Sequence, residues 1–173
     1  MRLTNFTDYS LRVLMYVAAQ PDRHTTIAEI AAAFVISESH LTKVVHHLGK
    51  KGLLTNARGR GGGVALASAP DRINLGAVVR AAEAGGALVE CFNTETNHCL
   101  ITPVCGLRGV LEQALAAFYS VLDHYTLADI TANRTTLQAV LGVALTERGA
   151  IPVRFAGSPP APKLAQWARG AGK

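Results

Sequence analysis

Residues 26–67 have the sequence TIAEIAAAFVISESHLTKVVHHLGKKGLLTNARGRGGGVALA, which predicts two short helices followed by a β-hairpin. The first four residues match a capping box. In this motif Thr26 and Glu29 each satisfy a free backbone N–H group where a helix begins. The helix that opens here is expected to end near Phe34, and only two residues separate it from the next helical signal.

The second helix of this segment is expected to follow Ser37, a favourable N-cap residue, to reach about Lys51 and to be closed by Gly52. Its apolar residues recur at helical spacing and predict a buried stripe formed by Leu41, Val44, Val45 and Leu48. The opposite, outward face is expected to carry His40, Lys43, His47 and Lys50. Two short helices at a tight turn, the second one basic on its outer side, are typical of a helix-turn-helix.

The hairpin that follows is predicted from two β-prone stretches, around residues 53–58 and 64–67, which flank a cluster of glycines. The cluster matches neither G-x-G-x-x-G nor G-x-x-x-x-G-K-[ST], and no helix is expected after it, so a nucleotide-binding loop is disfavoured. Arg58 and Arg60 are expected at the hairpin tip, where guanidinium groups can enter the minor groove of DNA. The sequence therefore predicts a mainly α protein built on a winged helix-turn-helix domain with a small β-hairpin wing.

The distribution of charge favours double-stranded DNA as a partner. The 173-residue chain has a formal net charge of +5, and residues 1–85 carry ten Lys or Arg against six Asp or Glu. No acidic residue occurs between Glu38 and Asp71. Such a run can also be a solvated face, but on a helix-turn-helix it favours phosphate contacts. Base edges in the major groove are then expected to be contacted by Ser39, His40, Thr42 and Lys43.

An N-terminal helix is predicted within TDYSLRVLMYVAAQ by the helical spacing of Leu11, Leu14, Met15 and Ala18. Another short helix is expected from Ile73 to about Glu83, which would complete a DNA-binding domain over residues 1–85. Asp8 and Arg12 interrupt the N-terminal apolar stretch, which disfavours a secretory signal. No uncharged apolar run approaches the roughly 18 residues of a membrane-spanning helix, so we expect a cytoplasmic protein without membrane contact.

A long helix is predicted after a loop that spans residues 86–105. Thr102 and Pro103 resemble an N-cap and a first helical residue, and the helix is expected to reach about Tyr125. A seam with coiled-coil-like steps of four and three residues consists of Leu107, Leu111, Ala114, Phe118, Val121 and Tyr125. An intramolecular core is one explanation, and a homodimer interface is the one favoured here, because one winged helix reads only half a two-fold operator.

Shorter helices are expected around residues 127–130 and within 133–148, so that residues 106–150 form the dimerisation helix with the C-terminal helices. Residues 151–173 are rich in Pro, Gly and Ala, and they predict a disordered tail.

All three cysteines lie in the loop CFNTETNHCLITPVC, residues 91–105. A zinc site with Cys99 and His98 lacks the usual closely spaced cysteine pair. Three buried thiols packing as small apolar groups are disfavoured by the polar residues 93–98. Cys105 is expected near a helix start, where the helix dipole favours a thiolate. Three thiolates suit an iron–sulfur cluster if a fourth ligand comes from elsewhere.

Four segments, MRLTNFTDYSLR, RGRGGG, CFNTETNHCLITPVCGL and LDHYTLADI, resemble a family of winged-helix iron–sulfur transcription regulators, specifically its nitric-oxide-sensing branch. The similarity covers about residues 1–145. It implies a homodimeric repressor that binds an inverted-repeat operator while its cluster is intact and releases DNA when nitric oxide destroys the cluster.

In that branch a [4Fe–4S] cluster is held by three cysteines of one subunit and a carboxylate near the N-terminus of the other. The resemblance thus implies Cys91, Cys99 and Cys105 with Asp8 of the partner subunit, and it places Arg12 one turn further along the same helix. Related regulators of cluster biogenesis use a histidine instead, so the acid favours the nitric-oxide branch.

Other roles for these acids stay open. Asp8 can also be an N-terminal helix acid favoured by the helix dipole, or an i,i+4 partner of Arg12. The fallback ligands are His98, Glu90 and Glu95.

The sequence leaves two other functions open. One is a winged-helix regulator that senses redox or iron–sulfur status through a [2Fe–2S] cluster. The other is an iron–sulfur enzyme or electron carrier. No G-x-S-x-G or H-E-x-x-H motif is present, and a basic winged helix would serve no purpose there, so we expect that the chain is not an enzyme.

Overall fold

The computed structural model describes residues 2–57, 59, 61–84 and 86–142. Its elements in chain order are α1 (Asn5–Ala18), α2 (Ile27–Phe34), α3 (Glu38–Lys50), β1 (Leu54–Ala57), β2 (Gly63–Leu66), the 3-10 turn η1 (Pro70–Arg72), α4 (Leu75–Ala82), the 3-10 turns η2 (Glu90–Phe92) and η3 (Thr102–Val104), α5 (Gly106–Asp123), α6 (Leu127–Ile130) and α7 (Arg134–Val140). The predicted wing-tip residues Arg58 and Arg60 lie outside the described residues, and so do residues 143–173, which include the predicted disordered tail.

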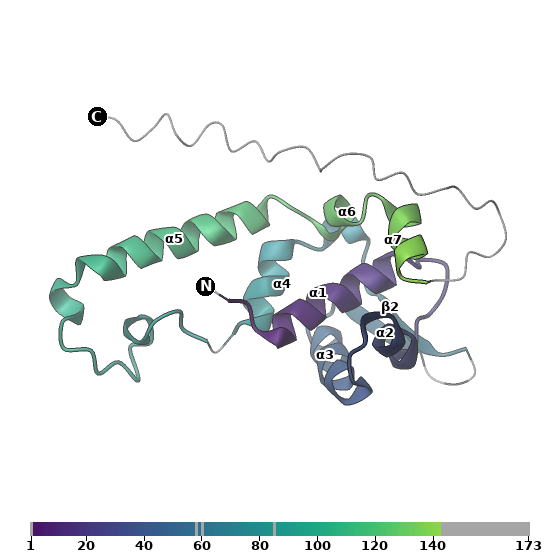
Figure 1. Ribbon diagram of the computed structural model, residues 1–173, viewed down its shortest axis with the longest axis horizontal. Helices are drawn as coiled ribbons and strands as arrows, with labels where there is room; N and C mark the ends of the chain where they lie inside the picture. Colours follow the sequence, from purple (N-terminus) through teal and green to yellow (C-terminus); the bar gives the residue numbers. More distant parts are fainter. Residues whose placement is uncertain (1, 58, 60, 85, 143–173) are drawn as a thin grey trace.

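The molecule has a body and an arm (Figure 1). The body contains α1 to α4 and the hairpin, and α5 projects from it as a long helix. After α5 the chain returns to the body, where α6 and α7 lie beside α1 and its neighbours. The expected mainly α winged helix-turn-helix with a small antiparallel hairpin is therefore confirmed.

The helix-turn-helix is set largely by local signals. The capping box is confirmed, since Thr26 Oγ1 accepts from the backbone N–H of Glu29 at 3.2 Å and Glu29 Oε2 accepts from that of Thr26 at 2.7 Å. Ser37 is the N-cap residue of α3, but its side chain makes no capping bond. The turn between the helices is made by Val35, whose φ of 54° is a left-handed conformation that β-branched residues rarely adopt.

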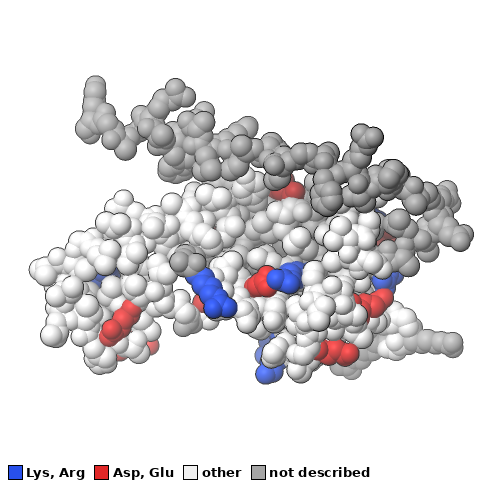
Figure 2. All heavy atoms as spheres, in the orientation of Figure 1, with Lys and Arg blue, Asp and Glu red and all other residues white. Residues whose placement is uncertain are grey.

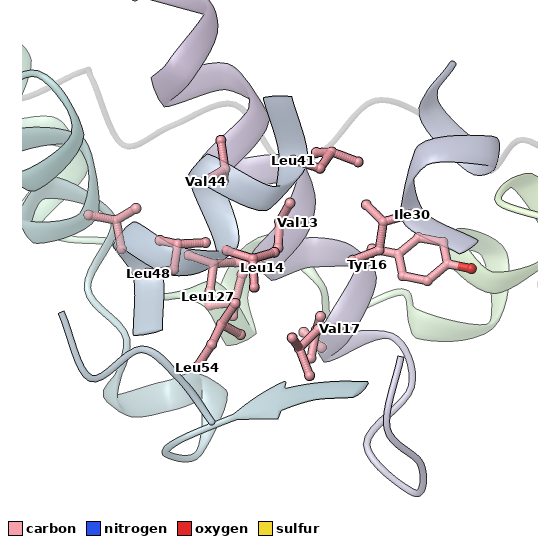
Figure 3. Close-up of a cluster of buried hydrophobic side chains, with 14 of the residues drawn as sticks. Val13, Leu14, Tyr16, Val17, Ile30, Leu41, Val44, Leu48, Leu54 and Leu127 are labelled. Carbon is pink, nitrogen blue, oxygen red and sulfur yellow. The ribbon is translucent and has the colours of Figure 1, made fainter. Parts of the chain in front are cut away.

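The core lies between α1, α3 and the hairpin (Figure 3). The predicted stripe of α3 is confirmed, because its four apolar residues are all buried. It packs with Val13, Leu14 and Val17 of α1, and Leu127 from α6 is also fully buried there. Each such side chain stabilises the fold by about 1.5–3 kcal/mol. The segment after the arm therefore contributes to the core of the body.

The apolar face of α1 differs from the predicted one. Leu14 and Ala18 are buried as expected, but Leu11 and Met15 are only half-buried, and Val13 and Val17 take their place in the core. The reason is that α1 contacts α3, α4, β2 and α6, so its buried face is wider than a single amphipathic stripe.

The wing is fastened to the chain segment that precedes α2. β1 and β2 pair antiparallel, with Leu54 opposite Leu66 and Ala57 opposite Gly63. Thr25 adds a third partner: its N–H donates to the Val64 carbonyl at 2.9 Å, and the Val64 N–H donates back at 2.8 Å. A Cβ atom on Gly63 would lie 2.7 Å from the Thr25 carbonyl oxygen, and the φ of Gly63 is +152°. Only glycine fits this close approach without strain.

The arm begins later than predicted. Thr102 does not cap α5, because its hydroxyl donates to the Cys99 carbonyl at 2.7 Å and approaches the Asn97 side chain. Thr102 and Pro103 begin the separate turn η3, and α5 begins at Gly106 with Cys105 as its N-cap residue. The extended backbone of Cys105 separates the turn from the helix.

The other end of the arm is joined to α4. Arg80 donates to both carboxylate oxygens of Asp123, at 2.7 and 2.5 Å, and lies 4.4 Å from the ring centre of Tyr119. Asn74 caps α4 through Ala77 N–H at 2.9 Å and donates to the Asp123 carbonyl at 2.8 Å. That cap explains why α4 starts at Leu75 and not at Ile73. These contacts fix the C-terminal end of α5 on the body.

Gly63→Ala is expected to lower the free energy of unfolding by about 1–3 kcal/mol, because the new methyl group would collide with the Thr25 backbone. Gly109→Ala is the matched control: nothing lies within 4 Å of its Cβ position, and alanine there is expected to stabilise α5 by up to about 1 kcal/mol. Urea unfolding measures both changes. Equal stability of the Gly63 variant and the unsubstituted chain would contradict the close approach.

The arm joint is expected to be sensitive to acid. Hydrogen bonds from the Arg80 guanidinium lower the pKa of Asp123 below its ordinary value. The ion pair is therefore fully formed above the unfolded pKa of about 3.9 and is lost as the pH falls through the lower folded pKa. Asp123→Asn should be less stable than the unsubstituted chain at pH 7, and the difference should shrink below about pH 4. Thermal unfolding at both pH values measures this, and a difference independent of pH would exclude the ion pair as its source.

Candidate functional site

The exposed face of α3 carries the residues predicted to contact DNA. Ser39, His40, Thr42 and Lys43 all lie exposed in the first turns of α3, opposite the buried stripe. The Thr42 hydroxyl donates to the Glu38 carbonyl at 2.7 Å. The side chains of this face are therefore presented by a helix whose other side is fixed in the core.

His47 does not lie on this outward face as predicted. It is half-buried, its ring meets the Phe6 ring edge-on at 5.1 Å between centroids, and its Nε2 has no hydrogen-bond partner among the described residues. Tyr9 stacks on His40 at 6.4 Å. Periodicity within α3 alone could not reveal these contacts, because they come from the first turns of α1.

Charge is unevenly spread over the surface (Figure 2). On the face drawn there, acidic and basic side chains are interspersed over the body, whereas the arm formed by α5 is almost uncharged. The exposed lysines of α3 and the turn after it are Lys43, Lys50 and Lys51.

The cysteine loop is organised by its own polar residues. Cys91 lies in η2, Cys105 occupies the N-cap position of α5 without a side-chain capping bond, and all three cysteines are free and half-buried. The His98 N–H donates to Glu90 Oε1 at 2.7 Å, and the Cys99 N–H donates to Asn97 Oδ1 at 3.0 Å. The polar stretch that the sequence shows around Cys99 thus holds the turns that carry the thiols.

The donor set suits an iron–sulfur cluster better than a single metal ion. Within the described ranges, no three His, Cys, Asp or Glu side chains converge to hold one ion. A cluster makes a different demand, because each thiolate binds its own iron atom. The loop carries three free thiols, which could each bind one iron atom, and a fourth ligand would have to come from another residue. Of the fallback ligands, Glu90 is already engaged by the backbone of His98.

Asp8 lies in the first turn of α1 and forms an ion pair with Arg12. Arg12 Nη2 lies 2.8 Å from Asp8 Oδ2, and Arg12 Nε donates to Asp8 Oδ1 at 3.0 Å. Both side chains are more than two-fifths exposed. The Arg12 guanidinium also lies 5.7 Å from the ring centre of Phe34. Within the described part of one chain, Asp8 and the cysteines do not come together as a ligand group.

Apolar side chains are exposed around the cysteines and along the arm. No residue of α5 is buried. The large exposed apolar residues of this region are Leu100, Ile101, Val104, Leu107, Val110 and Val121. Leu100 is 96% exposed although it is next to Cys99. Of the predicted seam, the described part of this chain leaves Leu107, Ala114, Val121 and Tyr125 exposed, whereas Leu111 and Phe118 are partly buried. None of the described helices is long and apolar enough to cross a membrane.

Comparisons with known proteins agree with this architecture. The family model Rrf2, described as an iron-dependent transcriptional regulator, matches residues 3–133. The HTH-type transcriptional regulator NsrR of Halalkalibacterium halodurans is 52% identical over 142 residues, which cover 82% of this chain and 97% of that protein. NsrR of Bacillus subtilis is 48% identical over the same share of each chain.

Solved structures show the same fold. IscR of T. potens has a TM-score of 0.63 at 23% identity, covering 77% of this chain and 88% of that one. CymR, the global cysteine regulator of B. subtilis, has a TM-score of 0.60 at 25% identity, covering 77% and 98%. The winged-helix body, the family match and the similarity to NsrR proteins together show that this chain belongs to the Rrf2 family of transcriptional regulators and is not an enzyme.

Proposed function

We propose that the protein is a homodimeric repressor whose iron–sulfur cluster senses nitric oxide and whose operator binding depends on that cluster. The observation that carries the proposal is the position of three free, half-buried cysteines between the DNA-binding body and an uncovered apolar arm. The similarity of most of the chain to NsrR proteins supports the same function. A cytoplasmic location suits the proposal, because thiols stay reduced there.

Operator binding is assigned to α3 and the wing. Ser39, His40, Thr42 and Lys43 would meet base edges and phosphates in the major groove, and Arg58 and Arg60 would reach the minor groove. One copy offers one such helix, so an inverted-repeat operator requires two copies related by a two-fold axis.

The arm is proposed as the dimer interface. Leu107 is 62% exposed and Val121 is 46% exposed in the single chain, and the face of the arm that is drawn in Figure 2 carries little charge. An apolar helix face of this length is stabilised when a second copy covers it, because water is then removed from both faces. The same dimer would bring the cysteine loop of one chain near the body of the other.

The cluster is proposed to be a [4Fe–4S] group held by Cys91, Cys99 and Cys105 of one chain and by Asp8 of the partner subunit. Asp8 is exposed enough to be shared, but it would have to leave or loosen its ion pair with Arg12. When bound, the cluster would supply an iron with a carboxylate ligand, which is a weaker ligand than thiolate and leaves that iron open to a small neutral gas.

The contacts of α1 suggest how cluster loss would affect DNA binding. Asp8 lies between Phe6 and Tyr9 in the chain, and these two rings touch His47 and His40 of α3. A change in the position of Asp8 would therefore be transmitted to the recognition helix through two aromatic contacts. The cluster and the operator would then both favour the same arrangement of α1 and α3, which couples the two binding sites.

Cys99→Ala is expected to abolish the visible absorption of the anaerobically purified protein and to weaken operator binding on the order of tenfold or more, the usual scale of such coupling. Absorption, Mössbauer spectroscopy and gel shift measure this.

Asp8→Ala leaves three thiolates and should lower cluster stability or the nitric-oxide response more than the DNA affinity of intact protein. A [2Fe–2S] spectrum would favour the redox-sensing alternative. Unchanged operator affinity without iron would refute the coupling.

Lys43→Ala is expected to weaken operator binding and to lower the slope of log affinity against log salt by about one, as for one lost phosphate contact. If Lys43 reads a base, its replacement should also relax the operator preference. Fluorescence anisotropy at several salt concentrations distinguishes these results. Arg134→Ala is the control, because Arg134 lies in α7 and pairs with Asp22. An equal loss of affinity in the control would show that general charge, and not α3, determines binding.

A further inference from the structure

One carboxylate joins the two segments of the chain that would hold the proposed clusters, namely the first turn of α1 and the beginning of the cysteine loop. Glu83 follows the last residue of α4, and its Oε1 accepts three hydrogen bonds from the beginning of α1. The Thr4 N–H lies at 2.8 Å and the Thr4 hydroxyl at 3.0 Å, and the third donor is the hydroxyl of Thr7. Thr7 is fully buried and Glu83 is partly buried, so this contact lies at the edge of the interior.

The contact is also favourable electrostatically. Thr4 is the N-cap residue of α1, and a negative charge at a helix N-terminus is stabilised by the helix dipole. Burial opposes ionisation of Glu83, but the hydrogen bonds from Thr7 and Thr4 outweigh it and lower the pKa of Glu83. The side chain is therefore a carboxylate at neutral pH, and hydrogen bonds to a charged acceptor are stronger than neutral ones.

The location of Glu83 gives the contact its significance. In the sequence Glu83 precedes Cys91 by eight residues, at the root of the cysteine loop, and Thr7 is the neighbour of Asp8. In a two-fold dimer each chain would donate Asp8 to one cluster and three cysteines to the other. Both clusters can obtain all four ligands only if the first turn of α1 and the cysteine loop keep a fixed relative position within each chain.

We propose that Glu83 is a positioning residue that holds the root of the cysteine loop against the first turn of α1 and so couples the cluster to operator binding. This inference rests on the proposed function. Glu83 acts through Thr4 and Thr7, and it does not itself touch the cluster or DNA. The simpler alternative is that Glu83 only stabilises the start of α1.

The test compares Glu83→Gln with Thr7→Val, each in the full chain. The first substitution removes the charge, and the second removes one donor while keeping the size and shape of the side chain. The matched control is Glu112→Gln, which removes the same charge from a carboxylate that pairs with Arg108 within α5. Each variant is studied iron-free and after cluster loading.

Two measurements separate positioning from simple stability. Hydrogen–deuterium exchange of the iron-free proteins should become faster in residues 4–10 and 84–92 together for Glu83→Gln and Thr7→Val, and in neither segment for Glu112→Gln. The ratio of operator affinities between loaded and iron-free protein should fall about tenfold for Glu83→Gln. The double variant with Glu83→Gln and Thr7→Val should show the same fall in this ratio as Glu83→Gln alone, because both substitutions disrupt the same contact.

The exchange rates and the affinity ratio together decide the role of Glu83. Exchange could become faster while the ratio of operator affinities between loaded and iron-free protein stays within twofold of that of the unsubstituted chain. This result would overturn the positioning role and leave Glu83 as a residue that only stabilises the start of α1. Unchanged exchange would show that Glu83 does not join the two segments, which also overturns the proposal. Equal operator affinity of loaded and iron-free unsubstituted protein would instead show that the proposed function itself fails. If Glu83→Gln does not fold, Thr7→Val decides by the same two measurements.

Discussion

The packing of α1 is the constraint on which the rest of the structure depends. Its apolar residues meet the buried stripe of α3 on one side, and the hairpin, α4 and α6 on others. Because interiors are close-packed, a shift of α1 cannot be absorbed without moving these neighbours. The same helix carries Asp8 in its first turn and aromatic contacts to the recognition helix. A single element thus connects the candidate ligand and the DNA-binding face.

The fold was predictable where the signal is local and repeated. The capping box of Thr26 and Glu29 and the four-residue stripe of α3 depend only on neighbours along the chain, and both are present. Thr102 is not the cap that the sequence predicts, because its hydroxyl donates to the Cys99 carbonyl within the cysteine loop. Val35 could not be foreseen, since its left-handed conformation is imposed by the packing of two helices and not by its own preference.

The sequence can only propose the donors of the candidate site, and it does not predict how they are arranged. Three cysteines in a polar loop indicate thiolate chemistry, but how the loop is held depends on Glu90, Asn97 and Thr102. The partial burial of His47 depends on Phe6, and the hydrogen bond from Thr4 to Glu83 joins residues more than seventy positions apart. Such long-range contacts leave no periodic trace in a sequence. The proposed Asp8 ligand of the partner subunit would leave even less trace, because each chain would then contribute ligands to two different clusters.

The proposed dependence of DNA binding on the cluster is tested most directly by titrating the operator complex of the iron-loaded protein with nitric oxide under anaerobic conditions. Cluster absorption and the fluorescence anisotropy of labelled operator are followed in the same sample. We predict that operator is released in step with the loss of cluster absorption. Operator that stays bound after the cluster absorption has disappeared would contradict the coupling between cluster and DNA.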